Sequence, residues 1–320
     1  MDGIKEVIFV DNKKVSRDFS RLGLGLFLFM LIPQIVASVC HILLLQVFPA
    51  ITEQSWYLWM LSYVPMYFIG FPVLCIIWWD VPKDGYVRQS QPVKIGLGKM
   101  FLIICGCMTV AYGLNYVSMF LMEFFSTLKG TAIDNPLESM LDGSGVWISS
   151  FVVMIVAPIM EEIVFRWMLY KRLMLYGSTV YIIFSAAVFA MFHGNLFQML
   201  YAFVLGLIFA YVIVLTDKIY YSIILHIVVN ALGGGIVNIL TNFASETVVS
   251  IYSLFVLAVV FVGIIVILLS LRYRNNVSNT LYNESGYVHI QKKSKILLNP
   301  GMLLYTILIA IIMFTSMFLV

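Results

Sequence analysis

Residues 146–170 read VWISSFVVMIVAPIMEEIVFRWMLY, an apolar stretch that carries two adjacent glutamates and an arginine in its interior. At a rise of about 1.5 Å per residue, a helix of this length can cross about 30 Å of hydrocarbon. Ionisable side chains at membrane depth are rare, and those that occur usually serve a function. The stretch therefore predicts a membrane-spanning helix that carries a functional site.

The composition of the whole chain agrees with a membrane protein. Hydrophobic residues make up 62% of the 320 residues and charged residues 11%, whereas soluble domains have about 25% charged residues. The first apolar run is too long for the apolar core of a signal peptide. We expect an all-α polytopic protein of the cell membrane with about nine spans. These are 22–50, 55–79, 100–125, 146–170, 176–194, 196–216, 219–241, 248–271 and 297–319.

The basic residues indicate how the spans are oriented. Every lysine and arginine except Lys129 and Arg166 falls on the same side of nine alternating spans, and Arg166 lies within a span. Cytoplasmic loops of membrane proteins carry the excess of lysine and arginine. We therefore expect the N terminus to be cytoplasmic.

The three charges of the fourth span differ in their helical positions. Glu162 and Arg166 are four residues apart, so an α-helix places them on one face as an ion pair. Glu161 lies about 100° away around the helix. Helix packing can explain one buried ion pair, but it does not explain a second buried carboxylate. We interpret Glu162 and Arg166 as organising residues and Glu161 as a candidate general base.

Two later spans carry further polar residues. His193 ends the run 189–193, and His226 and Asn230 are four residues apart on one helix face. A lone histidine in a span is most often a packing or interfacial residue, which is how we interpret His41. Two histidines, an amide and two carboxylates on three helices instead predict a shared polar site that is reached from the cytoplasm.

Helix-breaking residues flank this predicted site. Pro158 lies one turn before the glutamates, and residues 233–235 are three consecutive glycines. A proline frees a backbone carbonyl and can kink a helix, while glycines permit close helix approach or a break. We expect irregular helix geometry at both places.

Three motifs occur in order in separate predicted spans: Ala157-Pro158-x-x-Glu161-Glu162-x-x-x-Arg166, then Phe189-x-x-x-His193, then His226-x-x-x-Asn230. Together they resemble the CPBP family, which includes the type 2 CAAX prenyl endopeptidases and the bacteriocin-processing membrane proteases often labelled Abi. The resemblance covers about 146–240. It departs from many members at Trp167, where glycine is common.

The resemblance implies an intramembrane endopeptidase that hydrolyses a peptide bond near the C terminus of a peptide or membrane-associated protein. It implies that Glu161 and His193 activate the attacking water and that His226 and Asn230 stabilise the oxyanion. The partners it implies are membrane lipid and a substrate tail, either lipidated or bacteriocin-like. We find no nucleic-acid-binding motif.

The cofactor stays open. Glu161, His193 and His226 are three candidate zinc ligands that leave a fourth position for water. A His-Glu-x-x-His signature is absent from the sequence. We favour a metal-free mechanism over a zinc-dependent one.

The chain divides into six predicted segments, with an eight-helix body followed by a polar linker and one added helix. They are a cytoplasmic N-terminal segment (1–21), three N-terminal spans (22–145), a catalytic core with the three motifs (146–241), an eighth span (242–272), a cytoplasmic linker (273–296) and a C-terminal span (297–320).

Two other functions remain compatible with the sequence. A non-catalytic bacteriocin immunity or binding protein would keep the motifs for structure alone. A proton-coupled transporter would use the buried charges as a relay, although we detect no internal repeat that supports a transporter fold.

Overall fold

The computed structural model describes residues 8–83, 91–142, 145–271 and 288–318. These residues are helical apart from loops and one short two-stranded ribbon. The chain is an all-α, multi-pass membrane protein, as predicted, because eight of the described helices are long and apolar enough to cross a membrane. They are Asn12–Val47, Tyr57–Ile77, Leu97–Lys129, Val146–Tyr176, Leu196–Thr216, Ile219–Phe243, Glu246–Leu271 and Pro300–Phe318.

The chain forms two compact units, and the boundary between them falls within α6 (Val146–Phe151). The unit that carries the three motifs contains residues 91–133 and 150–271 of the described chain. Its further helices and helical turns are α4 (Leu97–Lys129), η3 (Val152–Val156), α7 (Ala157–Glu161), η4 (Glu162–Met168), α8 (Leu169–Leu173), η5 (Met174–Tyr176), α9 (Ser178–Phe192), α10 (Leu196–Thr216), α11 (Ile219–Asn230), η6 (Ala231–Gly235), α12 (Ile236–Phe243) and α13 (Glu246–Leu271).

The core of this unit lies between α4, α10, α11 and α13. Met108, Phe209 and Leu225 are fully buried members of this core. Apolar side chains also cover the outside of the unit: Leu254 and Phe261 of α13 are 65% and 62% exposed. A helix that is apolar on all sides suits a surface that faces lipid.

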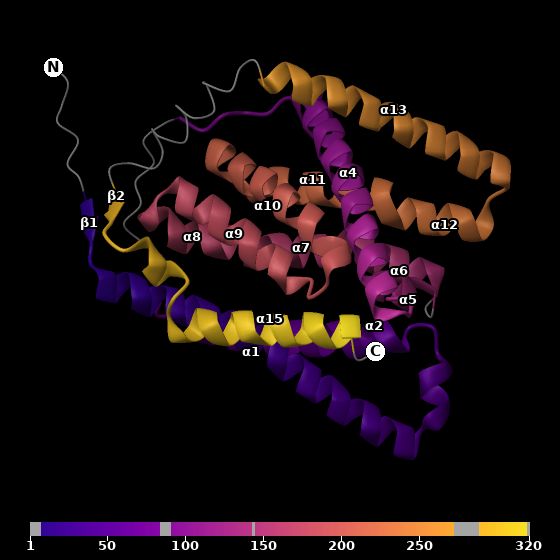
Figure 1. Ribbon diagram of the computed structural model, residues 1–320, viewed down its shortest axis with the longest axis horizontal. Helices are drawn as coiled ribbons and strands as arrows, with labels where there is room; N and C mark the ends of the chain where they lie inside the picture. The colour runs from indigo at the N-terminus through magenta and orange to yellow at the C-terminus, as the bar shows by residue number, and fades with distance from the viewer. Residues whose placement is uncertain (1–7, 84–90, 143–144, 272–287, 319–320) are drawn as a thin grey trace. The chain divides into compact units, whose positions relative to one another are not determined.

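One predicted span is shorter than we expected. The segment 176–194 contains α9, whose 15 residues extend about 22 Å and fall short of the hydrocarbon thickness. α9 lies beside α10 as a helical hairpin (Figure 1), and Gly194 takes a positive φ of 63° in the turn. A hairpin returns the chain to the side of the membrane from which it started. The basic loops before α9 and after α10 therefore still lie on the same side, as predicted.

The helix that carries the glutamates is continuous and contains two π-helical turns, η3 and η4. In these turns, backbone hydrogen bonds join residues five apart. The N–H of Ala157 bonds to the carbonyl of Val152, and Pro158 has no N–H to offer. The carbonyl of Val153 is therefore left without a backbone donor. The irregularity expected near the proline is a π turn.

The three glycines form another π turn, η6. A Cβ on Gly235 would overlap the side chain of Met154, so the glycine permits η6 to approach η3 closely. This contact brings the helix of the third motif against the helix of the first.

The second unit contains residues 8–83, 134–142, 145–149 and 289–318 of the described chain. Within it, α15 lies along α1 (Figure 1). His41 bonds to the hydroxyl of Tyr57 through Nδ1 at 2.7 Å, a contact that fits the packing or interfacial role predicted for it. The elements are β1 (Ile8–Val10), α1 (Asn12–Val47), η1 (Pro49–Glu53), α2 (Tyr57–Pro65), η2 (Met66–Gly70), α3 (Phe71–Ile77), α5 (Pro136–Asp142), β2 (Val288–Ile290, whose first residue groups with the other unit), η7 (Lys293–Ile296) and α15 (Pro300–Phe318).

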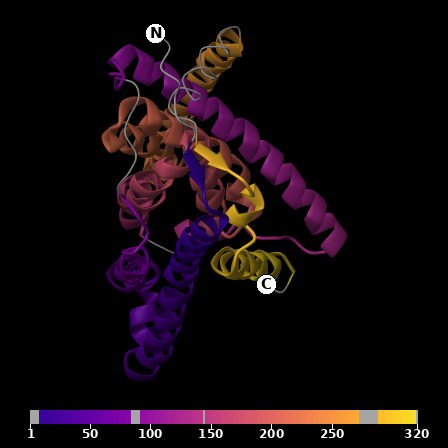
Figure 2. The same ribbon diagram turned by 90° about the vertical axis from the view of Figure 1, so that its left-hand side faces the viewer.

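Two segments that we predicted to lie outside the spans, 1–21 and 273–296, contain some regular structure. α1 begins at Asn12, inside the segment 1–21 that we expected to precede the spans. Of the predicted linker 273–296, residues 273–287 lie outside the described residues, and the remainder contains β2 and η7. β1 and β2 form a ribbon (Figure 2) that was not predicted, because strands of three residues leave no usable alternation of hydrophobicity.

Candidate active site

Glu162 is the centre of the buried polar cluster. Its Oε1 is 2.9 Å from Nδ1 of His226, and the hydroxyl of Ser222 donates to its Oε2. A carboxylate accepts hydrogen bonds, so Nδ1 of His226 carries the hydrogen. Ser222 and His226 are one turn apart on α11, and one face of this helix therefore holds the Glu162 side chain.

The predicted ion pair between Glu162 and Arg166 is confirmed. Nε of Arg166 lies 3.5 Å from Oε2 of Glu162, and both side chains are 0% exposed. The guanidinium carbon is 3.9 Å from the centre of the Phe189 ring. Its three nitrogens form no hydrogen bond within the described chain. Charge attraction and stacking on the aromatic ring therefore hold Arg166 in place.

Glu161 faces the other nitrogen of the same histidine. Its Oε2 lies 3.6 Å from Nε2 of His226, and its side chain keeps 18% exposure. This separation is too long for a direct hydrogen bond, but it allows a water to bond to both groups. The two glutamates have the different surroundings that the sequence predicted, with His226 between them.

His193 lies at the C-terminal end of α9, and its ring is only partly buried. Its Nδ1 is 2.9 Å from the carbonyl oxygen of Phe189. A carbonyl only accepts, so Nδ1 donates and Nε2 keeps a lone pair. The Phe189 ring contacts both imidazoles, at centroid distances of 4.9 Å to His193 and 5.8 Å to His226. No hydrogen bond or ion pair joins His193 to Glu161, and their cooperation stays a prediction.

Asn230 reaches across to the first motif. Its Nδ2 donates to the carbonyl of Val153 at 3.1 Å, which is the carbonyl that Pro158 leaves without a backbone donor. The side-chain amide has two N–H groups. One holds η3 in place, and the second remains for a ligand.

Sequence reasoning missed three hydroxyl groups of this site. Ser222 binds Glu162, and its signal was its position four residues before His226. Ser185 donates to the carbonyl of Phe165 at 2.5 Å, and Tyr181 donates to the carbonyl of Arg166 at 3.4 Å. These last two bonds fasten α9 to η4, where the π turn changes the backbone pairing.

Trp167 is the position where the first motif departs from many family members. Its ring stacks on the ring of Tyr170, with 6.0 Å between the ring centroids. Nζ of Lys171 lies 4.3 Å from the centre of the Trp167 ring. Neither contact involves a side chain that pairs with Glu162, whose partners are Ser222, His226 and Arg166.

The geometry does not form a ready zinc site. Among the residues that the structure describes, no group of three His, Cys, Asp or Glu side chains is placed to hold a metal ion. Both ring nitrogens of His226 face glutamate oxygens. Glu161, His193 and His226 as placed thus do not fit a shared zinc ion.

Comparison with known proteins places the three motifs in one family region. Residues 143–232 match the family model described as type II CAAX prenyl endopeptidase Rce1-like. No curated protein and no solved structure matches the chain. The matched segment contains all six predicted site residues, and the matched family is a peptidase family. The resemblance drawn from the motifs is therefore confirmed: residues 143–232 of this multi-pass membrane protein are similar to the type II CAAX prenyl endopeptidase Rce1-like family.

Proposed function

We propose that the chain is an intramembrane endopeptidase in which Glu161 activates water for attack on a peptide bond near the C terminus of its substrate. The observation that carries the proposal is the position of His226, with Nδ1 2.9 Å from Glu162 and Nε2 3.6 Å from Glu161. Glu162 is surrounded by donors and a cation. Glu161 is the partly exposed carboxylate, so it is the group able to accept a proton from water.

The proposed reaction moves one proton from the water to the leaving amine. Oε2 of Glu161 takes a proton from the water as the water oxygen bonds to the carbonyl carbon. Nε2 of His193 accepts a hydrogen bond from the same water and orients it. The C–N bond then breaks, and Glu161 returns the proton to the leaving nitrogen. The products are a carboxylic acid and an amine, and the acid then loses its remaining proton to solvent.

His226 and Asn230 are the proposed donors to the tetrahedral oxygen. Glu162 lies behind Nδ1 of His226, so it stabilises the positive charge on the ring when Nε2 also carries a proton. Asn230 offers its second N–H. Loss of one such donor typically lowers the rate about 10²–10³-fold, because a site shielded from water strengthens electrostatic interactions.

The proposed substrate is the C-terminal tail of a lipidated protein. The name of the matched family specifies prenylated CAAX tails. A lipid anchor would hold such a tail at the membrane in which the glutamates are buried. This argument favours a lipidated tail over a bacteriocin-like peptide.

The proposal is tested with the purified chain in lipid vesicles and two matched peptides, one farnesylated at a cysteine near its C terminus and one unmodified. We expect the wild type to release the residues that follow the farnesylated cysteine. Glu161→Gln should lower that rate by about 10²–10⁴-fold. Glu123→Gln is the matched control, because it removes an exposed carboxylate from α4 of the same unit.

Two results would count against the proposal. We expect Glu161→Gln to fold as the wild type does, so an unchanged rate in that variant would remove Glu161 from the chemistry. Tight binding of the farnesylated peptide by the wild type without cleavage would instead support a non-catalytic binding protein.

A further inference from the structure

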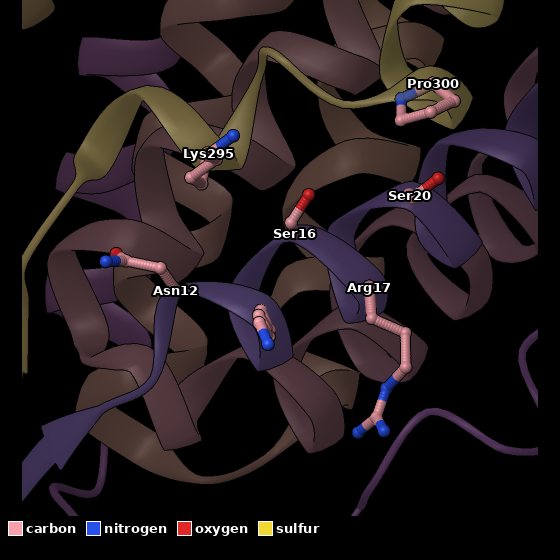
Figure 3. A pocket seen from close by; sticks show the side chains of 7 residues that line it. Asn12, Ser16, Arg17, Ser20, Lys295 and Pro300 are labelled. Atoms are coloured by element: carbon pink, nitrogen blue, oxygen red, sulfur yellow. The ribbon is translucent and has the colours of Figure 1, made fainter.

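A basic cavity lies in the second unit, where α1 and α15 begin (Figure 3). Its volume is about 410 Å³. Three of its lining side chains are cationic and none is acidic. The proposed peptidase chemistry uses none of them. The lining residues are Asn12, Lys13, Ser16, Arg17, Ser20, Lys295 and Pro300.

Contacts between the two ends of the chain build this cavity. A Cβ on Gly301 would overlap the carbonyl oxygen of Ser20, so α15 starts in close contact with α1. The N–H of Gly301 donates to the hydroxyl oxygen of Ser20 at 3.0 Å. Asn12 bonds to Gln291 and to the backbone of Lys292, both at 3.1 Å. These bonds fix the segment before α15 beside the first turns of α1.

Several donors in the cavity are available to a ligand. The ammonium groups of Lys13 and Lys295 and the hydroxyl of Ser16 bond to no other part of the described chain. Arg17 bonds through Nε to Asp18 at 3.1 Å, and its guanidinium points away from Ser16 and Lys295 (Figure 3). The first amides of α15 are already bonded within the unit. Side chains, and not a helix end, are therefore the ligand groups.

This donor set fits a phosphate group. Phosphate oxygens carry negative charge and accept several hydrogen bonds, and ammonium, guanidinium and hydroxyl groups supply them. The cavity lies where two spanning helices start, and the long apolar run of α1 follows directly from Leu22. Lipid headgroups occupy this depth of a membrane. A headgroup phosphate there is present at a far higher local concentration than free phosphate.

We propose that this cavity binds the phosphate of an anionic phospholipid headgroup and thereby holds α15 against α1. Lys13 and Lys295 neutralise the phosphate, and the hydroxyl of Ser16 donates to it. In Figure 3 the hydroxyl of Ser16 and the amine of Lys295 lie on the two sides of the same space, one from α1 and one from η7. The lipid would link the first and last spanning helices of the unit.

The test compares two double variants of the full chain in detergent. Lys13→Gln/Lys295→Gln removes two cations from the cavity. Lys14→Gln/Lys293→Gln removes the same charge from exposed neighbours on the same two elements, outside the cavity. Short-chain phosphatidylglycerol is titrated, and binding is read by native mass spectrometry. We expect about 30-fold weaker binding for the cavity variant and less than about threefold for the control.

A third variant and two further ligands complete the test. Ser16→Ala keeps every charge and should weaken phosphatidylglycerol binding about tenfold. Phosphatidylcholine and inorganic phosphate are titrated in parallel, and both should bind far more weakly than phosphatidylglycerol. Equal losses of phosphatidylglycerol affinity in the two double variants would overturn the proposed binding site, since general surface charge would explain such losses. Equal binding of phosphatidylcholine, or binding of inorganic phosphate alone, would overturn the assignment to an anionic lipid.

Discussion

Replacing Arg166 by methionine would leave Glu162 buried without the cation that lies 3.5 Å away. At an effective dielectric constant of about 20, two unit charges at this distance attract each other by about 5 kcal/mol. Removing one partner of a buried pair typically costs about 3–5 kcal/mol. We expect Arg166→Met to lower the free energy of unfolding by this amount, because only Ser222 and His226 would remain to stabilise the carboxylate.

Removing both charges separates the ion pair from other effects. Glu162→Gln/Arg166→Met leaves no uncompensated charge, so it should be more stable than Arg166→Met, with an interaction energy of about 2–3 kcal/mol. Glu162→Gln alone should lower the free energy of unfolding by less than Arg166→Met does. In that variant the guanidinium of Arg166 would still lie over the Phe189 ring, a contact that contributes up to about 2 kcal/mol when desolvated.

The assay is equilibrium unfolding in mixed micelles with increasing dodecyl sulfate, followed by tryptophan fluorescence. The matched control is Arg21→Met, which breaks an ion pair with Asp80 at a similar distance of 3.4 Å but in partly exposed surroundings. We expect the control to change the free energy of unfolding by less than about 1 kcal/mol. An interaction energy below about 0.5 kcal/mol in the double variant of Glu162 and Arg166 would refute the reasoning.

Other contacts in the site lead to equally specific expectations. Asn230→Leu should lower the free energy of unfolding by about 1–2 kcal/mol, measured in the same assay, since it removes the donor to Val153; an unchanged value would mean that the bond does not support the π turn. Ser222→Ala should slow peptide cleavage about tenfold, and Ser222→Thr should restore much of the rate; equal losses in both variants would indicate a packing role. Gly235→Val should destabilise the fold by about 1–3 kcal/mol, and adding Met154→Ala should recover part of this loss; no recovery would contradict the close approach of η6 and η3.

The long apolar helices could be predicted because hydropathy reports burial in lipid directly. The predicted span 248–271 corresponds to α13 at Glu246–Leu271. The predicted span 176–194 shows the limit of this signal. Glycines in positive-φ conformations at 177 and 194 bound α9, and hydropathy does not report backbone conformation.

The candidate site was predictable in its charges and less so in its geometry. Residues four apart are close to one turn apart in α- and π-helices, so the pairing of Glu162 with Arg166 could be predicted without knowledge of the π turn. The bond from Asn230 to Val153 could not, because it depends on which carbonyl the π turn leaves free. Ser222 carried little signal, since serines in apolar helices commonly bond to their own backbone.

The placement of α15 along α1 was also beyond the sequence pattern. A hydropathy profile identifies both helices but does not say which helices pack together. Gly301 is informative only once the backbone of Ser20 is known to lie against it. The cavity between the two helices, with cations from both ends of the chain, follows from this long-range contact.

The most direct test of Glu161 as the base of a membrane peptidase is a comparison of protein C termini in cells that carry the wild-type chain or Glu161→Gln. We predict that a small set of membrane-associated proteins has shortened C termini with the wild type and full-length C termini with the variant, while both chains are present in the membrane in equal amounts. Identical C termini in the two strains, or the same shortened set in both, would contradict it.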